Sequence, residues 1–520
     1  MRLSLSRRQI LAGASCLALP ALHVQAQAAS ARVALLHLND FHSRHEGAQP
    51  AGAVCRVGAP CAGGSARLVG AMLAARQAAQ AEGRATLALD AGDQALGSLF
   101  YTQHRGLAEA AVQRAWGVQA MAPGNHEFNL GPASLARYLR ALGAPLLAAN
   151  LDTRAEPALD GLVAPYAVFM AGGARIAVVG LALESTPQVS SPGPNLRFGS
   201  AEEAALRAIA ELRASGPATI VMLSHRGVAA DRAMAEAVPG IDVIIGGHSH
   251  TLLAEPELVA GRERAVRIVQ VGALGRWAGR LDLDLGAAGQ VLAHAGGARE
   301  ITPETPEDPR TAALIDELAR PLIALRARPV TEAAPGFDLA TCRAGECAIG
   351  NLLAEALLEA VPGADVAMTN AGGIRTGLPA GQVTFGDVLN VLPFSNTVAT
   401  ARLRGVDLLA ALEHGLSRGG GAFPQVAGIA LDWAPQAPAG SRLLGARITQ
   451  GAKAGPVRPE GDYLLVTNNF LRGGGDGYAM LRDRALEAYD GGPPLEDSLA
   501  AFMGKAGRIA PSVDGRINPR

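Results

Sequence analysis

The chain has 520 residues, 49% of them hydrophobic, and a formal net charge of -1. This length exceeds what a single hydrophobic core supports and predicts two to four domains. The near-zero charge, without a basic block, argues against a protein that binds nucleic-acid polymers. After residue 30, no apolar run approaches the roughly 20 residues that a membrane-spanning helix requires, so we expect no membrane span.

Residues 1–28 have the features of a targeting segment. Ser6–Leu11 reads SRRQIL, a twin-arginine signature, and an apolar stretch and the cleavage motif Ala26–Ala28 follow it. This pattern predicts twin-arginine export of a folded bacterial protein, with a periplasmic or secreted final location. The alternative is an ordinary secretion signal that contains an arginine pair by chance. Both interpretations place the mature protein in an oxidising compartment.

Four cysteines remain once Cys16 is removed with the targeting segment. They form two close pairs in sequence, Cys55 with Cys61 and Cys342 with Cys347. Four cysteines allow three pairings, and the local one is favoured because each pair closes a small loop in a compartment that permits disulfides. A zinc site is the competing interpretation, but the usual C-x2-C spacing is absent. We therefore expect two local disulfides.

The predicted elements indicate two α/β regions. Residues 31–308 alternate apolar, strand-like runs with alanine-rich helical stretches such as 66–82 and 201–214. The Pro- and acid-rich residues 301–308 mark a boundary. Apolar residues then follow helical spacing over 309–328, which predicts a linking helix and a hinge within 309–334. A second α/β region occupies 335–520.

Metal-binding side chains follow the apolar runs of the first region. Short apolar runs bounded by Gly and polar residues indicate buried strands, and ligands bind beyond the carboxyl ends of such strands. Any one of these side chains alone fits a turn or a helix cap better. Together they predict two divalent cations and two-metal hydrolysis, and the mixed nitrogen and oxygen donors suit Zn, Mn or Co better than Mg or Ca. The residues are Asp40, His42, Asp93, Asn125, His225, His248 and His250.

The order of the motifs resembles the 5′-nucleotidase family, which includes bacterial periplasmic nucleotidases, UDP-sugar hydrolases and animal ecto-5′-nucleotidase. The resemblance covers nearly the whole mature chain. It implies an N-terminal calcineurin-like metallophosphoesterase domain, an α/β/β/α sandwich, over 31–308. It also implies a C-terminal α/β substrate-binding domain over 335–520, which swings about a hinge to deliver the phosphate to the metals. The motifs are LHLNDFHSR, LDAGDQ, GNHEFN, LSHRG and GGHSHT, followed by NAGGIR, LPFSNT and NNFLRGGGDGY.

The resemblance also implies roles for the metal-binding residues. Asp40, His42 and His250 bind the first ion, Asn125, His225 and His248 bind the second, and Asp93 bridges both.

The resemblance further implies that His126 donates a hydrogen bond or a proton to the developing charge. A purely structural histidine beside a ligand is the alternative. Three residues later the chain has Asn129, where relatives that prefer simple 5′-nucleotides carry Asp. An amide cannot stabilise an imidazolium as a carboxylate can, and relatives that cleave 2′,3′-cyclic nucleotides often carry Asn there. The preferred ester is therefore open.

The second domain supplies the substrate residues that the resemblance implies. Arg343 and Arg375 hold the phosphate, with Asn370 close by, because planar guanidinium groups suit a phosphate dianion. Phe423 and Phe470 stack on the two faces of the base, and Asp476 binds the ribose hydroxyls. The alternative is that both phenylalanines are core residues, as phenylalanine usually is.

These observations predict an exported phosphohydrolase that acts on a small-molecule nucleotide, the nucleoside 5′-monophosphate. Three other activities stay open: a 2′,3′-cyclic-nucleotide 2′-phosphodiesterase with 3′-nucleotidase activity, a UDP-sugar hydrolase and a thiosulfate-ester hydrolase. A nucleotide-binding protein without turnover is the non-enzymatic alternative. It is disfavoured because all seven ligand positions are filled. The sequence leaves the native metal, the base and the oligomeric state open.

Overall fold

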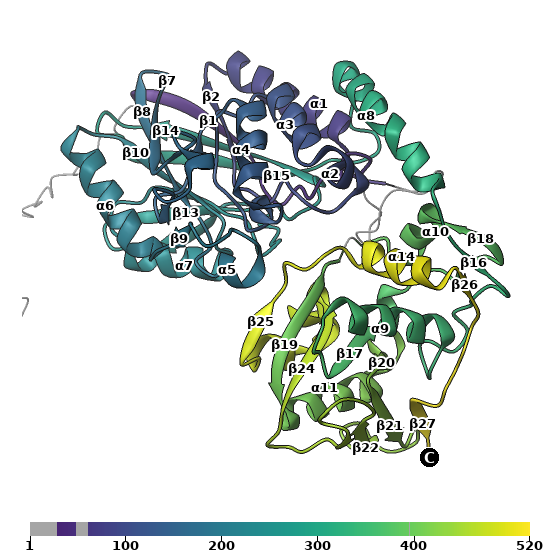
Figure 1. The fold of residues 1–520 in the computed structure, drawn as a ribbon. Helices are drawn as coiled ribbons and strands as arrows, with labels where there is room; N and C mark the ends of the chain where they lie inside the picture. Colours follow the sequence, from purple (N-terminus) through teal and green to yellow (C-terminus); the bar gives the residue numbers. More distant parts are fainter. Residues whose placement is uncertain (1–28, 48–60, 395) are drawn as a thin grey trace, which may run out of the picture.

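The computed structural model describes residues 29–47, 61–394 and 396–520. The chain folds into two α/β lobes joined by helix α8 (Pro309–Ala327), which lies at the upper right of Figure 1. The predicted targeting segment, Cys16 and Cys55 lie outside the described residues, so the export signal and the Cys55–Cys61 pairing stay predictions. Within the described residues, no helix is both long enough and apolar enough to cross a membrane.

The N-terminal lobe contains two large sheets. One has the strand order β15-β14-β1-β2-β3-β4-β6 and the other the order β12-β13-β11-β10-β8-β7. The strands of the first are β15 (Val291–Glu300), β14 (Trp277–Leu285), β1 (Ala31–Leu38), β2 (Ala85–Asp90), β3 (Ala120–Met121), β4 (Leu146–Leu147) and β6 (Val163–Ala164). Those of the second are β12 (Glu257–Ala260), β13 (Ala265–Val269), β11 (Val243–Ile245), β10 (Thr219–Ser224), β8 (Ala174–Leu181) and β7 (Tyr166–Ala171).

The two sheets face each other across an apolar core, and helices cover their outer faces. Val33 and Leu89 of one sheet and Val178 and Val221 of the other are fully buried in this core. Helices α1 (Ser65–Ala81), α2 (Leu99–His104), α3 (Leu107–Trp116) and α4 (Gly131–Leu142) pack on the first sheet, and α6 (Ala201–Ala214) and α7 (Val228–Ala237) on the second. The predicted α/β/β/α sandwich is confirmed, and α1 and α6 match the predicted helices.

The parallel strands bring the predicted ligand loops to one edge of the sandwich. β1 pairs in parallel with β2, β2 with β3, and β10 with β11. Strands that run in parallel end at the same edge of a sheet, so the loops that follow them meet there. The apolar runs identified in the sequence are these strands.

The C-terminal lobe is built around a five-stranded sheet of order β20-β17-β24-β19-β25. Its strands are β20 (Pro424–Ala427), β17 (Val366–Asn370), β24 (Asp462–Asn468), β19 (Val398–Arg404) and β25 (Glu487–Tyr489). Two smaller sheets have the orders β18-β16-β26 and β23-β22-β21-β27. Their strands are β18 (Gly381–Thr384), β16 (Pro329–Ala333), β26 (Arg508–Ile509), β23 (Gly455–Pro456), β22 (Leu443–Ile448), β21 (Ile429–Trp433) and β27 (Ile517–Pro519).

Helices surround this sheet, and the linking region is shorter than its predicted range. The helices of the lobe are α9 (Ala348–Ala360), α10 (Phe385–Val391), α11 (Gly405–Arg418), α12 (Asn469–Arg472), α13 (Ala479–Asp483) and α14 (Leu495–Ala506). Helix α8 begins at Pro309, as expected. The strand β16 lies within the predicted hinge range of 309–334 but pairs with β18 and β26 of the C-terminal lobe. The connection between the lobes is therefore essentially α8.

Candidate functional site

Five loops at the edge of the N-terminal sandwich carry the predicted metal ligands. They follow β1, β2, β3, β10 and β11. A non-glycine residue with positive φ is uncommon and persists where its surroundings hold it, which is frequent at functional sites. Five of the seven ligands have such backbones, with φ between 51° and 73°: Asp40, His42, Asp93, His248 and His250.

The ligand side chains converge into two adjoining groups. Asp40, His42 and His250 form one, and the Nε2 atoms of the two histidines lie 3.0 Å apart. Asp93, His225 and His248 form the other. The Oδ2 atom of Asp93 lies 3.1 Å from His225 Nε2 and 3.9 Å from His42 Nε2, so this carboxylate reaches both groups, as expected of a bridging ligand.

Two buried atoms at the site have the properties of metal donors. Asn125 Oδ1 is buried without a hydrogen-bond partner among the described residues, and His225 Nε2, also buried, faces the Asp93 carboxylate at 3.1 Å. The other ring nitrogen of His225 lies 2.6 Å from the main-chain oxygen of Ala91 and so carries the proton. His225 Nε2 is therefore the ring nitrogen that faces the group, where a bound cation would take the place of a proton. A buried polar atom left without a partner is costly, and a bound cation would remove that cost. The residues present fit two divalent cations.

The electrostatics of the site also suit cations. Burial lowers the pKa of His42 to about 3 and that of His248 to about 4, which keeps both imidazoles neutral, as metal coordination requires. Burial also opposes protonation of His225, but the carboxylates of Asp93 and Asp40 outweigh it and raise its pKa to about 10. The carboxylates thus create a strong preference for positive charge at the centre of the cluster.

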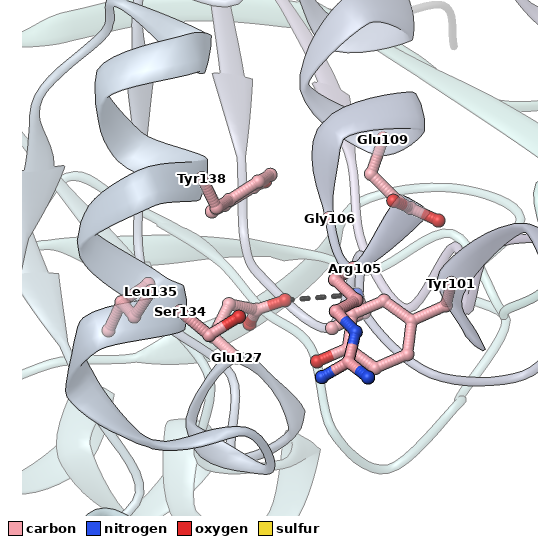
Figure 2. Close-up of a pocket in the computed structure, with 9 residues that line it drawn as sticks. Tyr101, Arg105, Gly106, Glu109, Glu127, Ser134, Leu135 and Tyr138 are labelled. Atoms are coloured by element: carbon pink, nitrogen blue, oxygen red, sulfur yellow. Dashed lines mark hydrogen bonds between the residues drawn. The ribbon is translucent and has the colours of Figure 1, made fainter. Parts of the chain in front are cut away.

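Glu127 supports this cluster and had no role in the sequence prediction. Figure 2 shows it in a small buried pocket beside Tyr101, Glu109 and Tyr138. Its carboxylate accepts hydrogen bonds from four main-chain N–H groups at 2.7–3.1 Å, which belong to Asp93, Gln94, Ala95 and Gly124. Glu127 therefore ties the loop of the bridging ligand to the loop of Asn125. Its place in the GNHE motif was the available signal.

His126 lies beside the cluster, where the resemblance placed it. It belongs to a single 3-10 turn (His126–Phe128), and its main-chain N–H donates to Asp93 Oδ1 at 2.9 Å. The ring also lies near His42, with 5.3 Å between the ring centroids. The side-chain Nδ2 of Asn129 lies 3.2 Å from Nδ1 of His126. An amide NH₂ group can only donate, so Nδ1 accepts and the ring proton lies on Nε2.

A cleft of about 970 Å³ separates the metal-ligand cluster from the C-terminal lobe. His42, Asp93, Asn125, His126, His248 and His250 line one wall. The opposite wall includes Phe394, Phe470, Arg472 and the glycines 473–475 of the C-terminal lobe. The cleft is large enough for a nucleotide-sized ligand.

The predicted substrate residues lie at one edge of the five-stranded sheet of the C-terminal lobe. Asn370 ends β17, and its Nδ2 donates to Asp476 Oδ2 at 2.8 Å. Asp476 itself has a φ of 51°. The exposed Arg375 lies over the ring of Phe394, with its guanidinium carbon 5.6 Å from the ring centroid. The structure thus brings Asn370 and Asp476 together and places Arg375 next to a residue of the cleft wall.

The two predicted stacking rings have different environments. Phe470 is 45% exposed and lines the cleft. Phe423 is 1% exposed and packs edge-on against Trp433, with 5.4 Å between ring centroids. Phe423 is thus a core residue in this conformation, and a base could reach its ring only if the surrounding loops moved. Its stacking role stays a prediction.

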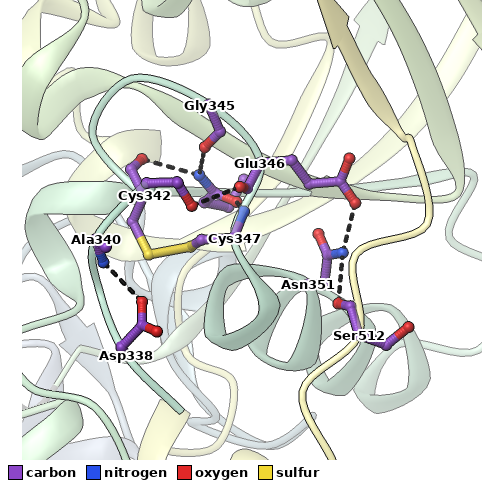
Figure 3. Close-up of a disulfide and its surroundings, with 10 residues drawn as sticks. Asp338, Ala340, Cys342, Gly345, Glu346, Cys347, Asn351 and Ser512 are labelled. Atoms are coloured by element: carbon purple, nitrogen blue, oxygen red, sulfur yellow. Dashed lines mark hydrogen bonds between the residues drawn. A yellow bond between two sulfur atoms is a disulfide. The ribbon is translucent and has the colours of Figure 1, made fainter.

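The loop that carries Arg343 is closed by the predicted Cys342–Cys347 disulfide, which Figure 3 shows. The buried side chain of Gln425 braces the same loop, because its Nε2 donates to the main-chain oxygens of Cys342 and Gly345 at 2.9 and 2.8 Å. Arg343 itself is exposed, and its main-chain oxygen accepts from Gly420. The prediction of this disulfide is confirmed.

Comparisons with known proteins agree with this architecture. Residues 33–252 match the calcineurin-like phosphoesterase family, and residues 327–483 match the 5′-nucleotidase C-terminal domain. The 5′-nucleotidase of Bos taurus is 30% identical over 521 residues, which cover 93% of this chain and 90% of the bovine protein. The crystal structure of a 5′-nucleotidase precursor from Thermus thermophilus is 35% identical, with a TM-score of 0.65 and coverage of 94% and 99% of the two chains.

A longer relative shares only part of its length with this chain. The trifunctional nucleotide phosphoesterase protein YfkN of Bacillus subtilis is 33% identical over 474 residues, which cover 82% of this chain. This match spans about a third of YfkN, 32% of its length. The bovine protein, by contrast, matches over nearly its whole length. With both domains matched in order, the chain belongs to the 5′-nucleotidase family of metal-dependent phosphoester hydrolases.

Proposed function

We propose that this protein is an exported 5′-nucleotidase that releases orthophosphate from nucleoside 5′-monophosphates. The observation that carries the proposal is the cleft, in which a cluster of donors for two divalent cations faces the exposed ring of Phe470. An aromatic face suits a nucleobase, and a two-cation cluster suits a phosphate ester. Both therefore fit a single nucleotide.

The proposed roles of the residues follow from their positions. When bound, two divalent cations would polarise the phosphoryl oxygens and activate a water for in-line attack. The N–H at Nε2 of His126 would donate to the phosphoryl oxygens as their negative charge increases. Asn370 and Asp476 would bind the ribose side of the substrate, with Arg343 and Arg375 holding the phosphate. Arg343 and Arg375 belong to the C-terminal lobe, and we propose that this lobe moves relative to the cations to deliver the phosphate.

A second candidate activity is hydrolysis of 2′,3′-cyclic nucleotides. Asn129 supports it because the amide lies in hydrogen-bond contact with the ring of His126. A carboxylate there would favour a protonated ring, whereas the amide favours a neutral ring that donates from Nε2. Whether the ring is protonated or neutral affects how strongly His126 stabilises a charged phosphate monoester compared with a cyclic diester.

A substrate panel tests the proposal. The purified protein with added Mn²⁺ is assayed with AMP, a 2′,3′-cyclic nucleotide, UDP-glucose and a thiosulfonate. We expect the highest kcat/KM with AMP and no turnover after exhaustive chelation. Preference for the cyclic nucleotide would establish the second candidate, and binding of AMP without turnover of any substrate would refute the enzymatic proposal.

Export is tested separately with Arg7→Lys/Arg8→Lys, which should retain the protein in the bacterial cytoplasm.

A further inference from the structure

A buried serine lies next to the partner of the catalytic histidine. Ser190 directly follows the short helix α5 (Thr186–Val189) and is 2% exposed. Its hydroxyl donates to Oδ1 of Asn129 at 2.7 Å. Asn129 in turn contacts Nδ1 of His126 through its Nδ2 atom. Ser190, Asn129 and His126 thus form a continuous hydrogen-bonded chain.

The bond from Ser190 fixes which way the amide of Asn129 faces. Since Oδ1 accepts from Ser190, the NH₂ group must face His126. Among the hydrogen bonds of the described residues, the bond to Asn129 is the one that reaches the ring of His126. The orientation of the ring thus depends on Asn129, and that of Asn129 on Ser190. A group that acts on the substrate must be held in the productive geometry by such supporting contacts.

The same segment contacts the C-terminal lobe. The hydroxyl of Ser191 lies 2.9 Å from that of Tyr489, the last residue of β25. Gly491 packs against the backbone of Ser190 so closely that a Cβ added there would lie 2.8 Å from Ser190 Cα. In Figure 1, α5 lies at the margin of the N-terminal lobe that faces β25, and the two elements are in contact.

We propose that Ser190 is a positioning residue for His126, acting through Asn129, and that the C-terminal lobe sets the position of Ser190 through Gly491 and Tyr489. The catalytic ring is then held in place when the substrate-binding lobe is docked against this segment. This inference rests on the proposed function, because it requires His126 to act on the substrate.

The first experiment measures kcat and KM of Ser190→Ala with AMP and with p-nitrophenyl phosphate. Loss of the hydrogen bond should lower kcat about ten-fold with both substrates and leave KM within two-fold, because the bond orients the catalytic ring rather than holding the substrate. In an Asn129→Ala background the same substitution should cost less than two-fold, because the chain is already broken. Ser215→Ala, at the surface end of α6, is the matched control and should leave kcat unchanged.

Equal losses in the two backgrounds would show that Ser190 acts only through general stability, and an unchanged kcat would remove the proposal altogether. Ser190→Cys provides a variant of nearly the same volume with a much weaker donor. It should reproduce the loss of kcat while unfolding at the temperature of the parent protein. A wild-type kcat in this variant would also overturn the proposal.

The second experiment tests the contribution of the C-terminal lobe. Gly491→Ala places a methyl group against Ser190 and should lower kcat several-fold in the parent but not in the Asn129→Ala background. Tyr489→Phe removes one hydroxyl and should have a smaller effect of the same kind. Equal losses of kcat in both backgrounds would show that the C-terminal lobe does not act on His126 through Ser190 and Asn129. If the wild-type protein itself turned over no phosphate ester, the proposed function would fail. If the enzyme were active but the losses of kcat from these substitutions and from Asn129→Ala were additive, only this inference would be contradicted.

Discussion

The cation-binding half and the nucleotide-binding half of the candidate site differ in how completely they are assembled. In the N-terminal lobe, loops after five strands already bring the metal-ligand side chains within a few ångströms of one another. In the C-terminal lobe, Phe470 lines the cleft, while Phe423 is buried and Arg343 is exposed on its disulfide loop. The cation-binding half is therefore assembled within one lobe, whereas Phe423 would contact a ligand only if the loops around it moved.

The largest effect should come from the bridging ligand. Asp93→Ala should lower kcat with AMP by about 10³-fold or more, because Asp93 serves both cations and metal activation contributes several kcal/mol to the barrier. His250→Ala removes a ligand to one cation from a side chain that is 48% exposed, and it should cost less. Steady-state kinetics and metal content by mass spectrometry provide the check. Wild-type turnover by Asp93→Ala, or after exhaustive chelation, would end the two-cation mechanism.

The second effect concerns Phe423 as a core residue. Phe423→Ala should lower the free energy of unfolding by about 3–5 kcal/mol, the usual cost of truncating a buried phenylalanine. The exposed Phe470 provides the matched control, and Phe470→Ala should change the free energy of unfolding by less than about 1 kcal/mol. Urea denaturation of the two variants gives the comparison. Similar stabilities would mean that Phe423 is more accessible in solution than in the structure.

A third effect concerns acid stability of the N-terminal lobe. His37 on β1 is fully buried, both ring nitrogens lack a hydrogen-bond partner, and burial lowers its pKa to about 4 from the ordinary 6.5. Between about pH 4 and pH 6.5, the unfolded chain therefore binds a proton at His37 while the folded protein does not. The stabilising contribution is complete above pH 6.5 and is lost as the pH falls towards 4, in total about 3 kcal/mol.

The matched variant for this prediction is His37→Leu, which removes the titrating group. Free energies of unfolding are measured with chelator present at pH 7 and pH 4, so that loss of metal does not contribute. Between pH 7 and pH 4, the free energy of unfolding of the wild-type protein should fall by about 3 kcal/mol more than that of the variant. An identical pH dependence of both proteins would show that His37 does not titrate differently in the folded state.

A smaller effect should follow removal of the Cys342–Cys347 bridge. The chain-entropy estimate for so short a loop is about 2 kcal/mol of the free energy of unfolding. The Cys342→Ser/Cys347→Ser variant should also raise KM for AMP a few-fold while leaving metal content unchanged, because the loop presents Arg343 and is still braced by Gln425. A fall in metal content would indicate that the two halves are more tightly coupled than the structure suggests.

The smallest change in free energy is expected for the exposed ring of the cleft. Stacking on an aromatic side chain contributes about 1–3 kcal/mol per base, so Phe470→Ala should raise KM for AMP about ten-fold. The small ester p-nitrophenyl phosphate has no nucleobase, and its KM should change much less. If both substrates suffered equally, Phe470 would support the fold of the loop rather than bind a base.

The sequence pattern by itself predicted an α/β region with candidate metal ligands at the ends of its strands, and the family resemblance added the sandwich. Apolar runs predict strands, and parallel strands end at a common edge of the sheet. The local sequence pattern therefore predicts that a residue directly after each run lies at that edge. The linking helix and the Cys342–Cys347 bridge followed from similarly short-range signals. The substrate residues came from motifs that the family shares, since the patterns around them do not by themselves distinguish a binding residue from a core residue.

Only the tertiary structure decided how residues distant in the chain contact one another. The burial of Phe423 depends on packing against Trp433 of a separate strand, and three of the four bonds to Glu127 connect loops that are about 30 residues apart in sequence. The contact of Ser190 with Asn129 joins residues 61 positions apart, and that of Ser191 with Tyr489 joins residues 298 positions apart. Such contacts depend on the relative placement of whole elements, which is set by the packing of the cores and leaves no periodic or motif-like trace in the sequence.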